Sequence, residues 1–278
     1  MSTAPRKRAL VFDSGVGGLS VLDAIVDADL AVDLDYAADN AWLPYGEKSD
    51  GALVARVPAL IAALVREWAP DAVVIACNTA STIALGAVRA AVSIPVVGVV
   101  PPIKPAAAAT RTGVIGLLAT PATVARPYVD DLIAKFAADK IVVRFGSTAL
   151  VGAAERALTG APVDKSAVAE AIAGLFDAPH GDHIDVVALA CTHFPLLAAE
   201  LAAAAPRRVT WLDSGAAIAA RLKDVAGLVE GQARLRRAGF TGPVDQGLWE
   251  AFGGRGFSAR ATIGPQFSVA PAAGEGYG

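Results

Sequence analysis

Two cysteines, Cys77 and Cys191, are the side chains of this sequence best suited to chemistry. They lie in a weak internal repeat, because residues 71–77 read DAVVIAC and residues 185–191 read DVVALAC. Each apolar run predicts a buried strand that ends at its cysteine, with a helix beginning directly afterwards. Ligands of open α/β sheets bind at the carboxyl ends of strands, and helix N-termini favour thiolates. The repeat therefore indicates two similar α/β halves, each offering one thiol to a shared cleft.

A pair of similar thiols suits a reaction that needs two similar groups. Removing a proton from one face of a carbon acid and returning a proton to the other face inverts its configuration. A thiol with an ordinary pKa of about 8.5 can act as a thiolate base or as a thiol acid. A neighbouring carboxylate or imidazole can take the thiol proton, and Asp13, Glu155 and His193 are the candidates. The pair therefore favours two-base proton transfer at carbon.

A glycine-rich turn follows the first apolar run and invites a nucleotide-binding interpretation. Residues 15–18 read GVGG, but the third position of a dinucleotide G-x-G-x-x-G pattern would be Ser20. The sequence also contains no G-K-[ST] phosphate loop and no G-x-S-x-G hydrolase motif. We expect these glycines to form a tight turn that presents Asp13 and Ser14.

The histidines do not form a metal motif. His180 and His183 lie in a polar loop, where we expect them to be solvated, and Cys191 and His193 are too close together for the usual zinc spacings. We therefore predict no metal. Cysteine–histidine hydrolysis at Cys191 is an alternative, although it leaves Cys77 unused. A pyridoxal enzyme would need a lysine in the cleft, and no lysine falls at a strand end beside these motifs.

The elements that must position these residues form an alternating pattern along most of the chain. Apolar runs predict strands near residues 8–12, 32–37, 71–76, 95–100, 113–118, 141–145, 185–190 and 208–212. Ala-rich stretches predict helices near residues 17–28, 50–68, 79–92, 121–137, 148–158, 164–177, 195–204 and 214–230. The strands are continuously apolar, which is typical of parallel sheets that helices cover on both faces. We therefore predict an α/β fold with two pseudo-symmetric α/β domains and mostly parallel sheets.

The expected domains are discontinuous in sequence. We expect residues 1–99 and 210–278 to form the first α/β domain and residues 100–209 the second, with an active-site cleft between them. The alternating pattern fades beyond about Gly239. The tail after about residue 260, which is rich in Gly, Pro and Ala from Pro265 onward, is expected to be loose.

Composition limits the partners of this chain. It has 278 residues, of which 54% are hydrophobic, and a formal net charge of −3, so nothing points to nucleic acid or to an acidic membrane surface. The longest uncharged stretch, Ala72 to Val88, contains several polar side chains and reads as a strand and a helix. The basic start is followed by too few apolar residues for a signal peptide. We therefore expect a cytoplasmic protein with reduced thiols, and no nucleic-acid or membrane partner.

Six strings of the sequence carry a more specific signal. They are FDSGVGGLSVL (12–22), DNAWLPYGEKS (39–49), VIACNTAST (74–82), IPVVGVVPP (94–102), GVIGLLATPAT (113–123) and LACTHFPLL (189–197). In this order, over roughly residues 8–214, they resemble glutamate racemases, in the cofactor-independent aspartate/glutamate racemase family. The resemblance implies two α/β domains around a cleft and an isomerase that works without a cofactor. It also implies that the protein supplies D-glutamate for peptidoglycan synthesis and so has a role in cell wall biogenesis and cell shape.

The resemblance also assigns roles to individual positions. Cys77 and Cys191 match the catalytic pair, the first serving the α-proton of D-glutamate and the second that of L-glutamate. Asp13 and His193 match the groups that assist these thiols, and Glu155 lies near the second one by count. The positions that match substrate-lining residues are Ser14, Pro44, Tyr45, Gly46, Asn78, Thr79, Thr120, Thr123 and Thr192.

The sequence departs from the family pattern in two places. Residues 147–154 lack a Cys-Pro pair and a second proline that are common there, so the role of Glu155 depends on its position alone. Trp42 stands where many members have a basic or small residue, and it either alters cleft access or regulation or is a surface aromatic. Tyr45 could equally be a packed loop aromatic, and Thr120 or Thr123 a helix N-cap.

The expected ligand is a small molecule, glutamate, and we expect no cofactor. The alternatives are a related racemase acting on aspartate or another α-acid, or a non-catalytic homologue that only binds amino acids. Oligomeric state varies in the family, so a homodimer is one arrangement. Some members are regulated by a cell-wall precursor, which makes such a precursor a candidate regulator.

Overall fold

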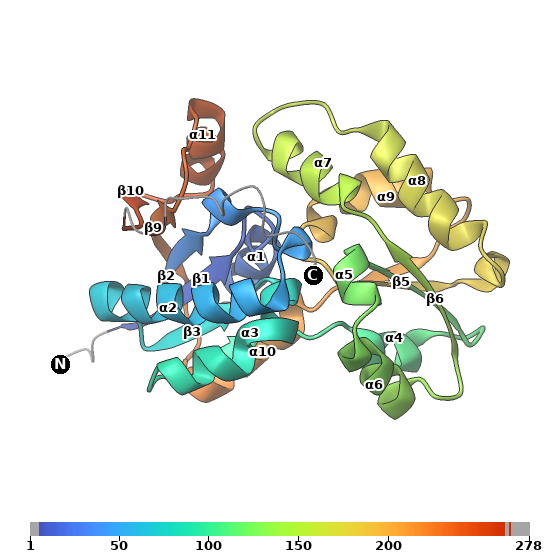
Figure 1. The fold of residues 1–278 in the computed structure, drawn as a ribbon, viewed down its shortest axis with the longest axis horizontal. Helices are drawn as coiled ribbons and strands as arrows, with labels where there is room; N and C mark the ends of the chain where they lie inside the picture. The colour runs from blue at the N-terminus through green and yellow to red at the C-terminus, as the bar shows by residue number, and fades with distance from the viewer. Residues whose placement is uncertain (1–5, 265–266, 268–278) are drawn as a thin grey trace. The chain divides into compact units, whose positions relative to one another are not determined.

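The structure is a computed structural model that describes residues 6–264 and residue 267. The chain divides into two compact units, one made of Met1–Val99 and Gly215–Gly278 and the other of Val100–Ser214. Each unit is built around a sheet of its own. Figure 1 traces the chain through both units.

The sheet of the first unit is parallel and has the order β10-β9-β2-β1-β3-β4. Its strands are β1 (Lys7–Asp13), β2 (Val32–Ala38), β3 (Ala72–Ile75), β4 (Val96–Gly98), β9 (Arg234–Phe240) and β10 (Ala259–Thr262). The strands β1, β2 and β3 are almost wholly buried, as continuously apolar strands covered on both faces should be.

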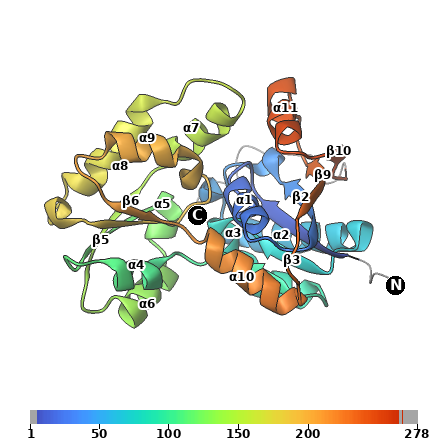
Figure 2. The same cartoon turned by 180° about the vertical axis from the view of Figure 1, so that it is seen from behind.

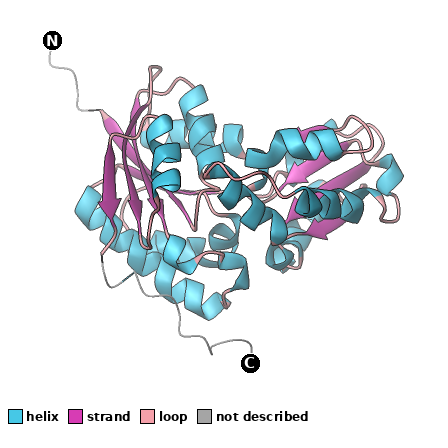
Figure 3. Ribbon diagram, turned by 90° about the horizontal axis from the view of Figure 1, so that it is seen from above, coloured by secondary structure: helices cyan, strands magenta, loops and turns pink. Residues whose placement is uncertain are grey.

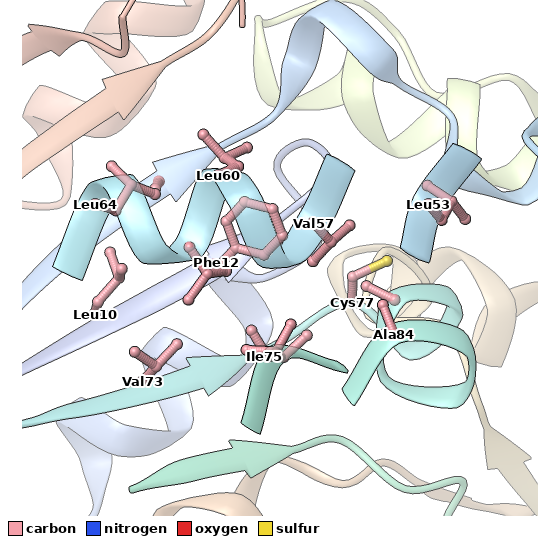
Figure 4. Packing of buried hydrophobic residues seen from close by; sticks show 14 of the residues in the cluster. Leu10, Phe12, Leu53, Val57, Leu60, Leu64, Val73, Ile75, Cys77 and Ala84 are labelled. Carbon is pink, nitrogen blue, oxygen red and sulfur yellow. The ribbon is translucent and has the colours of Figure 1, made fainter. Parts of the chain in front are cut away.

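Helices cover both faces of this sheet. The elements concerned are α1 (Leu19–Asp27), η1 (Asn40–Trp42), η2 (Tyr45–Glu47), α2 (Asp50–Trp68), α3 (Asn78–Ala91), α10 (Gly215–Ala226) and α11 (Gln246–Gly254). Side chains at alternate positions of β1 and β3, such as Leu10 and Phe12, pack against α2 and α3, and this core includes Cys77 (Figure 4). The helices α1 and α10 pack together on the other face, where α10 lies beside β3 (Figure 2).

The second unit repeats this plan on a smaller scale, with a parallel sheet of order β6-β5-β7-β8. Its elements are α4 (Ile103–Ala109), β5 (Val114–Ala119), α5 (Pro121–Val124), α6 (Pro127–Phe136), β6 (Ile141–Gly146), α7 (Ala149–Leu158), α8 (Lys165–Phe176), η3 (Gly181–His183), β7 (Val186–Leu189), η4 (Phe194–Leu197), α9 (Ala198–Ala204) and β8 (Thr210–Leu212). Side chains of α4 and α6 share a core with one face of β5 and β7. The helix α8 packs against β5 and β6 and lies beside α7 and α9 (Figure 1). Figure 3 shows strands with helices packed around them in each sheet.

The two sheets share a strand order, because β2-β1-β3-β4 corresponds to β6-β5-β7-β8, as two similar α/β halves would. The repeated aspartates also do the same work. Asp71 accepts a hydrogen bond from Arg8 N at 2.8 Å, at the start of β1. Asp185 accepts one from Arg111 N, also at 2.8 Å, just before β5. Each carboxylate therefore ties the strand that ends at a cysteine to the neighbouring central strand. The prediction of an α/β fold with parallel sheets is confirmed.

Some expected helices have other bounds. The helix expected over 121–137 is two helices, because Pro127 disfavours the helical region for the residue before it, and Arg126 is extended. The helix expected over 214–230 ends at Ala226, since Gly227 takes a left-handed φ of 62°. Within 195–204, the first turn is the 3₁₀ helix η4.

The sequence pattern also missed elements. Neither α4 nor the C-terminal run of β9, α11 and β10 was expected, and β10 occupies residues 259–262 around the point where the tail was expected to loosen. The predicted loose tail from 265 onward lies, apart from residue 267, outside the described residues. The unit boundary falls after Ser214 rather than at 209, because β8 pairs with β7. Within the described part of the chain, no helix combines the length and the apolar character needed to span a membrane.

Candidate active site

Cys77 lies where the sheet of the first unit meets a helix N-terminus. The strand β3 ends at Ile75, and Ala76 N continues the ladder by donating to Phe12 O at 2.7 Å. Cys77 then takes extended dihedral angles and is the N-cap residue of α3. Cys77 is 6% exposed, and the N–H groups of the first turn of a helix such as α3 favour negative charge at this point.

Asp13 is the last residue of β1, the strand beside β3, and Ser14 follows it. Ser14 Oγ lies 3.8 Å from Cys77 Sγ, and Asp13 is fully buried with its Oδ1 accepting from Gly15 N at 2.8 Å. The turn requires glycine at position 18, since a Cβ there would lie 2.8 Å from Asp13 Cβ and 2.8 Å from the Tyr36 hydroxyl oxygen. The glycines therefore form the tight turn that the sequence predicts.

Three further predicted residues lie close to Cys77. Asn78 and Thr79 open α3, and both side chains are buried. Asn78 Oδ1 is buried and has no hydrogen-bond partner among the described residues. Tyr45, in the Pro44–Gly46 segment, belongs to the same buried cluster as Cys77. A buried acceptor without a partner could accept a hydrogen bond from the donor group of a ligand.

Cys191 occupies the equivalent place in the second unit. The strand β7 ends at Leu189, and Ala190 N donates to Leu118 O at 2.8 Å, just as Ala76 N donates to Phe12 O. Cys191 is 6% exposed, and its Sγ lies 3.8 Å from His193 Nδ1. The structure differs from the expectation in one respect, because η4 follows at Phe194 and an α-helix begins only at Ala198.

His193 links Cys191 to a carboxylate. His193 Nε2 lies 2.7 Å from Glu155 Oε1 on α7, and the two side chains are 4% and 19% exposed. Burial alone would lower the pKa of His193, but hydrogen bonds to Cys191 and Glu155, and the charges of both, outweigh burial and raise that pKa well above 6.5. The raised pKa favours the protonated imidazolium form of His193 beside the Cys191 sulfur.

The predicted threonines of the second unit are also buried. Thr120 is the N-cap of α5, where its Oγ1 accepts from Thr123 N at 3.3 Å and donates to Thr123 Oγ1 at 2.9 Å. The N-cap interpretation of Thr120 is therefore confirmed. Thr192 lies between Cys191 and His193 in sequence and is buried with them.

Sequence reasoning missed a buried cluster behind Tyr45. Asp39, Arg56 and Thr241 meet there, and none of them was singled out in advance. Trp42 is half-buried, and the Arg56 guanidinium carbon lies 4.3 Å from the centre of its ring, so it is not a bare surface aromatic. The string DNAWLPYG contains Asp39 and its partner Tyr45, but the partners Arg56 and Thr241 lie 17 and 202 positions from Asp39.

The remaining histidines lie away from these residues. His180 and His183 are exposed, as the polar loop predicts, and His183 Nε2 lies 3.4 Å from the neighbouring Asp182 Oδ2. Among residues 6–264 and residue 267, no group of three or more His, Cys, Asp or Glu side chains is arranged to hold a metal ion.

The two thiols thus stand at equivalent strand ends with different neighbours. Cys77 has a hydroxyl and a helix N-terminus beside it, whereas Cys191 has an imidazole held by a carboxylate. Such thiols can be held ready as a base or as an acid. Two α/β units with parallel sheets, each with a cysteine at the end of a strand, are typical of a known class of protein.

The chain belongs to the Asp/Glu/hydantoin racemase family, whose family model matches residues 18–222. It is therefore an isomerase of the amino-acid racemase type. It is 56% identical to a glutamate racemase of Sphingopyxis alaskensis over 83% of this chain and 85% of that protein. It is 46% identical to a glutamate racemase of Vibrio cholerae over 82% of this chain and 84% of the relative.

Solved structures agree with these relatives. A crystal structure of Escherichia coli glutamate racemase in complex with L-glutamate and the activator UDP-MurNAc-Ala has a TM-score of 0.84. It is 40% identical in sequence and covers 93% of this chain and 98% of its own. Glutamate racemase from Thermus thermophilus in complex with β-chloro-D-alanine has a TM-score of 0.74 at 32% identity, covering 95% of this chain and 100% of its own. The predicted resemblance to glutamate racemases is confirmed.

Proposed function

We propose that this chain interconverts L- and D-glutamate by direct proton transfer between the α-carbon and two thiols, without a cofactor. The observation that carries the proposal is the pair of cysteines at equivalent strand ends, each beside groups that can control a thiol proton. Sequence identity to glutamate racemases over most of the chain supports glutamate as the substrate.

In the L-to-D direction the Cys191 thiolate takes the α-proton, and the C–H electron pair moves into the substrate carboxylate to give an enolate-like species. The Cys77 thiol then gives its proton to the opposite face of the α-carbon. The products are D-glutamate, a Cys191 thiol and a Cys77 thiolate, so atoms and charge balance. The reverse reaction exchanges the two roles. Asp13 assists Cys77, and His193 with Glu155 assists Cys191.

The remaining buried polar groups supply substrate contacts in this proposal. Asn78 Oδ1 is a free acceptor suited to the substrate ammonium group, and the N–H groups that open α3 suit a carboxylate. The other proposed contacts are Ser14, Pro44, Tyr45, Gly46, Thr79, Thr120, Thr123 and Thr192. Backbone donors aimed at the carboxylate would stabilise the enolate-like species.

The cellular setting follows from the same proposal. The chain would work in the cytoplasm and supply D-glutamate for peptidoglycan, with a homodimer as one candidate assembly. The Escherichia coli relative is described with the activator UDP-MurNAc-Ala, so we propose a cell-wall precursor of this chemistry as a regulator. Titrating UDP-MurNAc-Ala into the purified protein while measuring turnover tests the regulator. Unchanged turnover at saturation would exclude it.

Incubating L- and D-glutamate separately with the protein in D₂O tests the activity. We expect loss of the α-proton signal and loss of optical rotation, with deuterium appearing in the enantiomer that forms. L- and D-aspartate serve as matched substrates that are one methylene shorter. Glutamate that keeps both its α-proton and its rotation would refute the proposal.

A further inference from the structure

The Asp39 carboxylate is surrounded by hydrogen-bond donors from distant parts of the first unit. Tyr45 Oη donates to its Oδ2 at 2.5 Å, and Arg56 donates from Nε to Oδ2 at 2.6 Å and from Nη2 to Oδ1 at 2.7 Å. Thr241 Oγ1 donates to Oδ1 at 2.7 Å from the end of β9. The carboxylate is fully buried, and both of its oxygens are therefore satisfied.

The charge of Asp39 is balanced within the cluster. The Arg56 side chain is 9% exposed and makes a two-point contact with Asp39, which is the strong geometry for this pair. The Arg56 guanidinium also lies 4.3 Å from the centre of the Trp42 ring and 5.7 Å from that of Phe267. A buried carboxylate held this way by an arginine and two hydroxyls has a fixed position and orientation.

Hydrogen bonds to the end of β9 also fix the start of the segment that contains Tyr45. Thr241 Oγ1 accepts from Ala41 N at 3.1 Å, and Asn40 Oδ1 accepts from Gly242 N at 2.8 Å. The residues after β2 are thereby tied to the end of β9. Tyr45 itself is 1% exposed, and its only polar side-chain atom is the hydroxyl that donates to Asp39.

Tyr45 also packs in the same buried region as the Cys77 thiol. Tyr45 and Cys77 belong to one buried cluster, and η2, which contains Tyr45, packs against α3, which Cys77 caps. The Asp39 backbone reaches the same region, because Asp39 N donates to Asp13 O at 2.9 Å. Asp39 is therefore bonded to two segments that carry proposed substrate contacts.

We propose that Asp39, charge-balanced by Arg56, is a positioning residue that holds the Pro44–Gly46 segment against Cys77 in the geometry needed for proton transfer. The inference rests on the proposed function, because it concerns the same thiol. Asp39 does not touch the substrate and acts through Tyr45. A small displacement of reacting groups, about 1 Å, costs on the order of 100-fold in rate. Loss of the Asp39 carboxylate should therefore lower the rate of turnover far more than it lowers the stability of the fold.

The test compares Asp39→Asn with a matched control, Asp35→Asn. Asp35 is also fully buried, lies on β2 and pairs with an arginine, since Arg237 Nε is 3.0 Å from its Oδ1, but it does not contact the Tyr45 segment. Both variants should unfold at lower temperature than the parent chain. Only Asp39→Asn should raise KM for glutamate and lower kcat/KM, by roughly 10- to 100-fold. Asp35→Asn should keep kcat/KM within about 2-fold.

A second measurement covers the case in which Asp39→Asn does not fold. Tyr45→Phe and Thr241→Val each remove one hydroxyl and leave the Asp39–Arg56 pair in place. Tyr45→Phe should lower kcat/KM by about 10-fold, and Thr241→Val should lower it in the same sense. If Asp39→Asn folds, combining it with Tyr45→Phe should cost little more than Asp39→Asn alone, because both break the same link.

The outcomes separate this inference from the proposed activity. A parent chain that does not turn over glutamate refutes the proposed function, whatever the variants do. If the parent is active and Asp39→Asn lowers kcat/KM no more than Asp35→Asn does, the positioning role of Asp39 is refuted. Where Asp39→Asn does not fold, the same comparison is made between Tyr45→Phe and Asp35→Asn. Fully additive effects of Asp39→Asn and Tyr45→Phe refute it as well.

Discussion

The contact between His193 and Glu155 allows a pH-dependent prediction to be worked out in full. Glu155→Gln keeps the size of the side chain and an oxygen that can accept from His193 Nε2, but it removes the negative charge at 2.7 Å. The pKa of His193 should therefore fall from its raised position. We expect Glu155→Gln to destabilise the protein at neutral pH and to lower kcat by roughly 10-fold.

The size of the stability effect follows from burial. A hydrogen bond between charged groups contributes roughly 1.5–3 kcal/mol to stability. His193 is 4% exposed, but Glu155 is 19% exposed, so solvent screens part of the attraction. We therefore expect Glu155→Gln to reduce the free energy of unfolding by about 1–2 kcal/mol.

The sign of the pH dependence follows from the raised pKa of His193. In the unfolded chain a histidine protonates near pH 6.5, and in the folded chain His193 holds its proton to higher pH. The contribution of Glu155 is therefore fully present below about pH 6.5 and is lost as the pH rises through the folded pKa of His193. Urea unfolding of the parent and of Glu155→Gln from about pH 6 to about pH 10 measures this difference.

Glu170→Gln provides the control, because it removes the charge of an exposed glutamate on the neighbouring helix α8. Its unfolding free energy should follow that of the parent within about 0.5 kcal/mol at every pH. A gap between the parent and Glu155→Gln that stays constant from pH 6 to pH 10 would refute the reasoning, since it would show that the charge of His193 is not involved.

Three further predictions concern the thiols and the frame around them. Cys77→Ser and Cys191→Ser should each slow racemisation more than about 100-fold, while exchange of the α-proton in D₂O persists only with the enantiomer served by the remaining thiol. Gly18→Ala places a methyl group 2.8 Å from Asp13 Cβ, so circular dichroism melts should show a loss of about 1–3 kcal/mol together with lower turnover. Asp185→Ala removes a carboxylate that accepts from Arg111 N at 2.8 Å and from Thr110 Oγ1 at 2.6 Å, and should cost roughly 1–3 kcal/mol in urea unfolding at pH 7. Burial acts to raise the pKa of Asp185, but these hydrogen bonds lower it below 3.8, so this cost should shrink as the pH falls through the folded pKa.

The central strands could be predicted because they are apolar on both faces and are buried on both. The C-terminal strand β9 could not, because its sequence RLRRAGF contains three arginines. Arg237 pairs with Asp35 on β2, and its guanidinium lies 4.8 Å from the centre of the Trp68 ring. These partners make a charged sequence compatible with a strand, and they are invisible to a pattern read over neighbouring residues. The strand β10 has the sequence ARAT, which contains an arginine and a threonine and no run of large apolar residues.

The thiols could be located from the sequence because all the features that define their position lie within a repeat of seven residues. The strand, the aspartate that ties it to its neighbour and the cysteine at its end all lie within residues 71–77 and 185–191. The Asp39 cluster has no such local signature. Asp39 and Thr241 are 202 positions apart, and only the pairing of β2 with β9 brings them together.

The repeat also shows where the two halves differ chemically. Hydrogen bonds from Ala76 to Phe12 and from Ala190 to Leu118 align the two strand ends, so that Asp13 corresponds to Ala119 and Thr79 to His193. The acidic group, Asp13, is therefore the last residue of the central strand in one unit, and the basic group, His193, follows the cysteine in the other. The fold was repeated, but the proton partners of the thiols were not.

This chemical asymmetry cannot appear in the ratio kcat/KM. L- and D-glutamate have equal free energies, so the equilibrium constant between them is one and kcat/KM must be equal in the two directions, in the parent and in every variant. A change at one thiol, such as Glu155→Gln, must therefore lower kcat/KM for both enantiomers by the same factor. The effect of a change at one thiol should differ between the two directions only in how much of the loss is a lower kcat and how much is a higher KM. Progress curves started from either enantiomer measure this, and unequal kcat/KM values would mean that the measured reaction is not a simple racemisation.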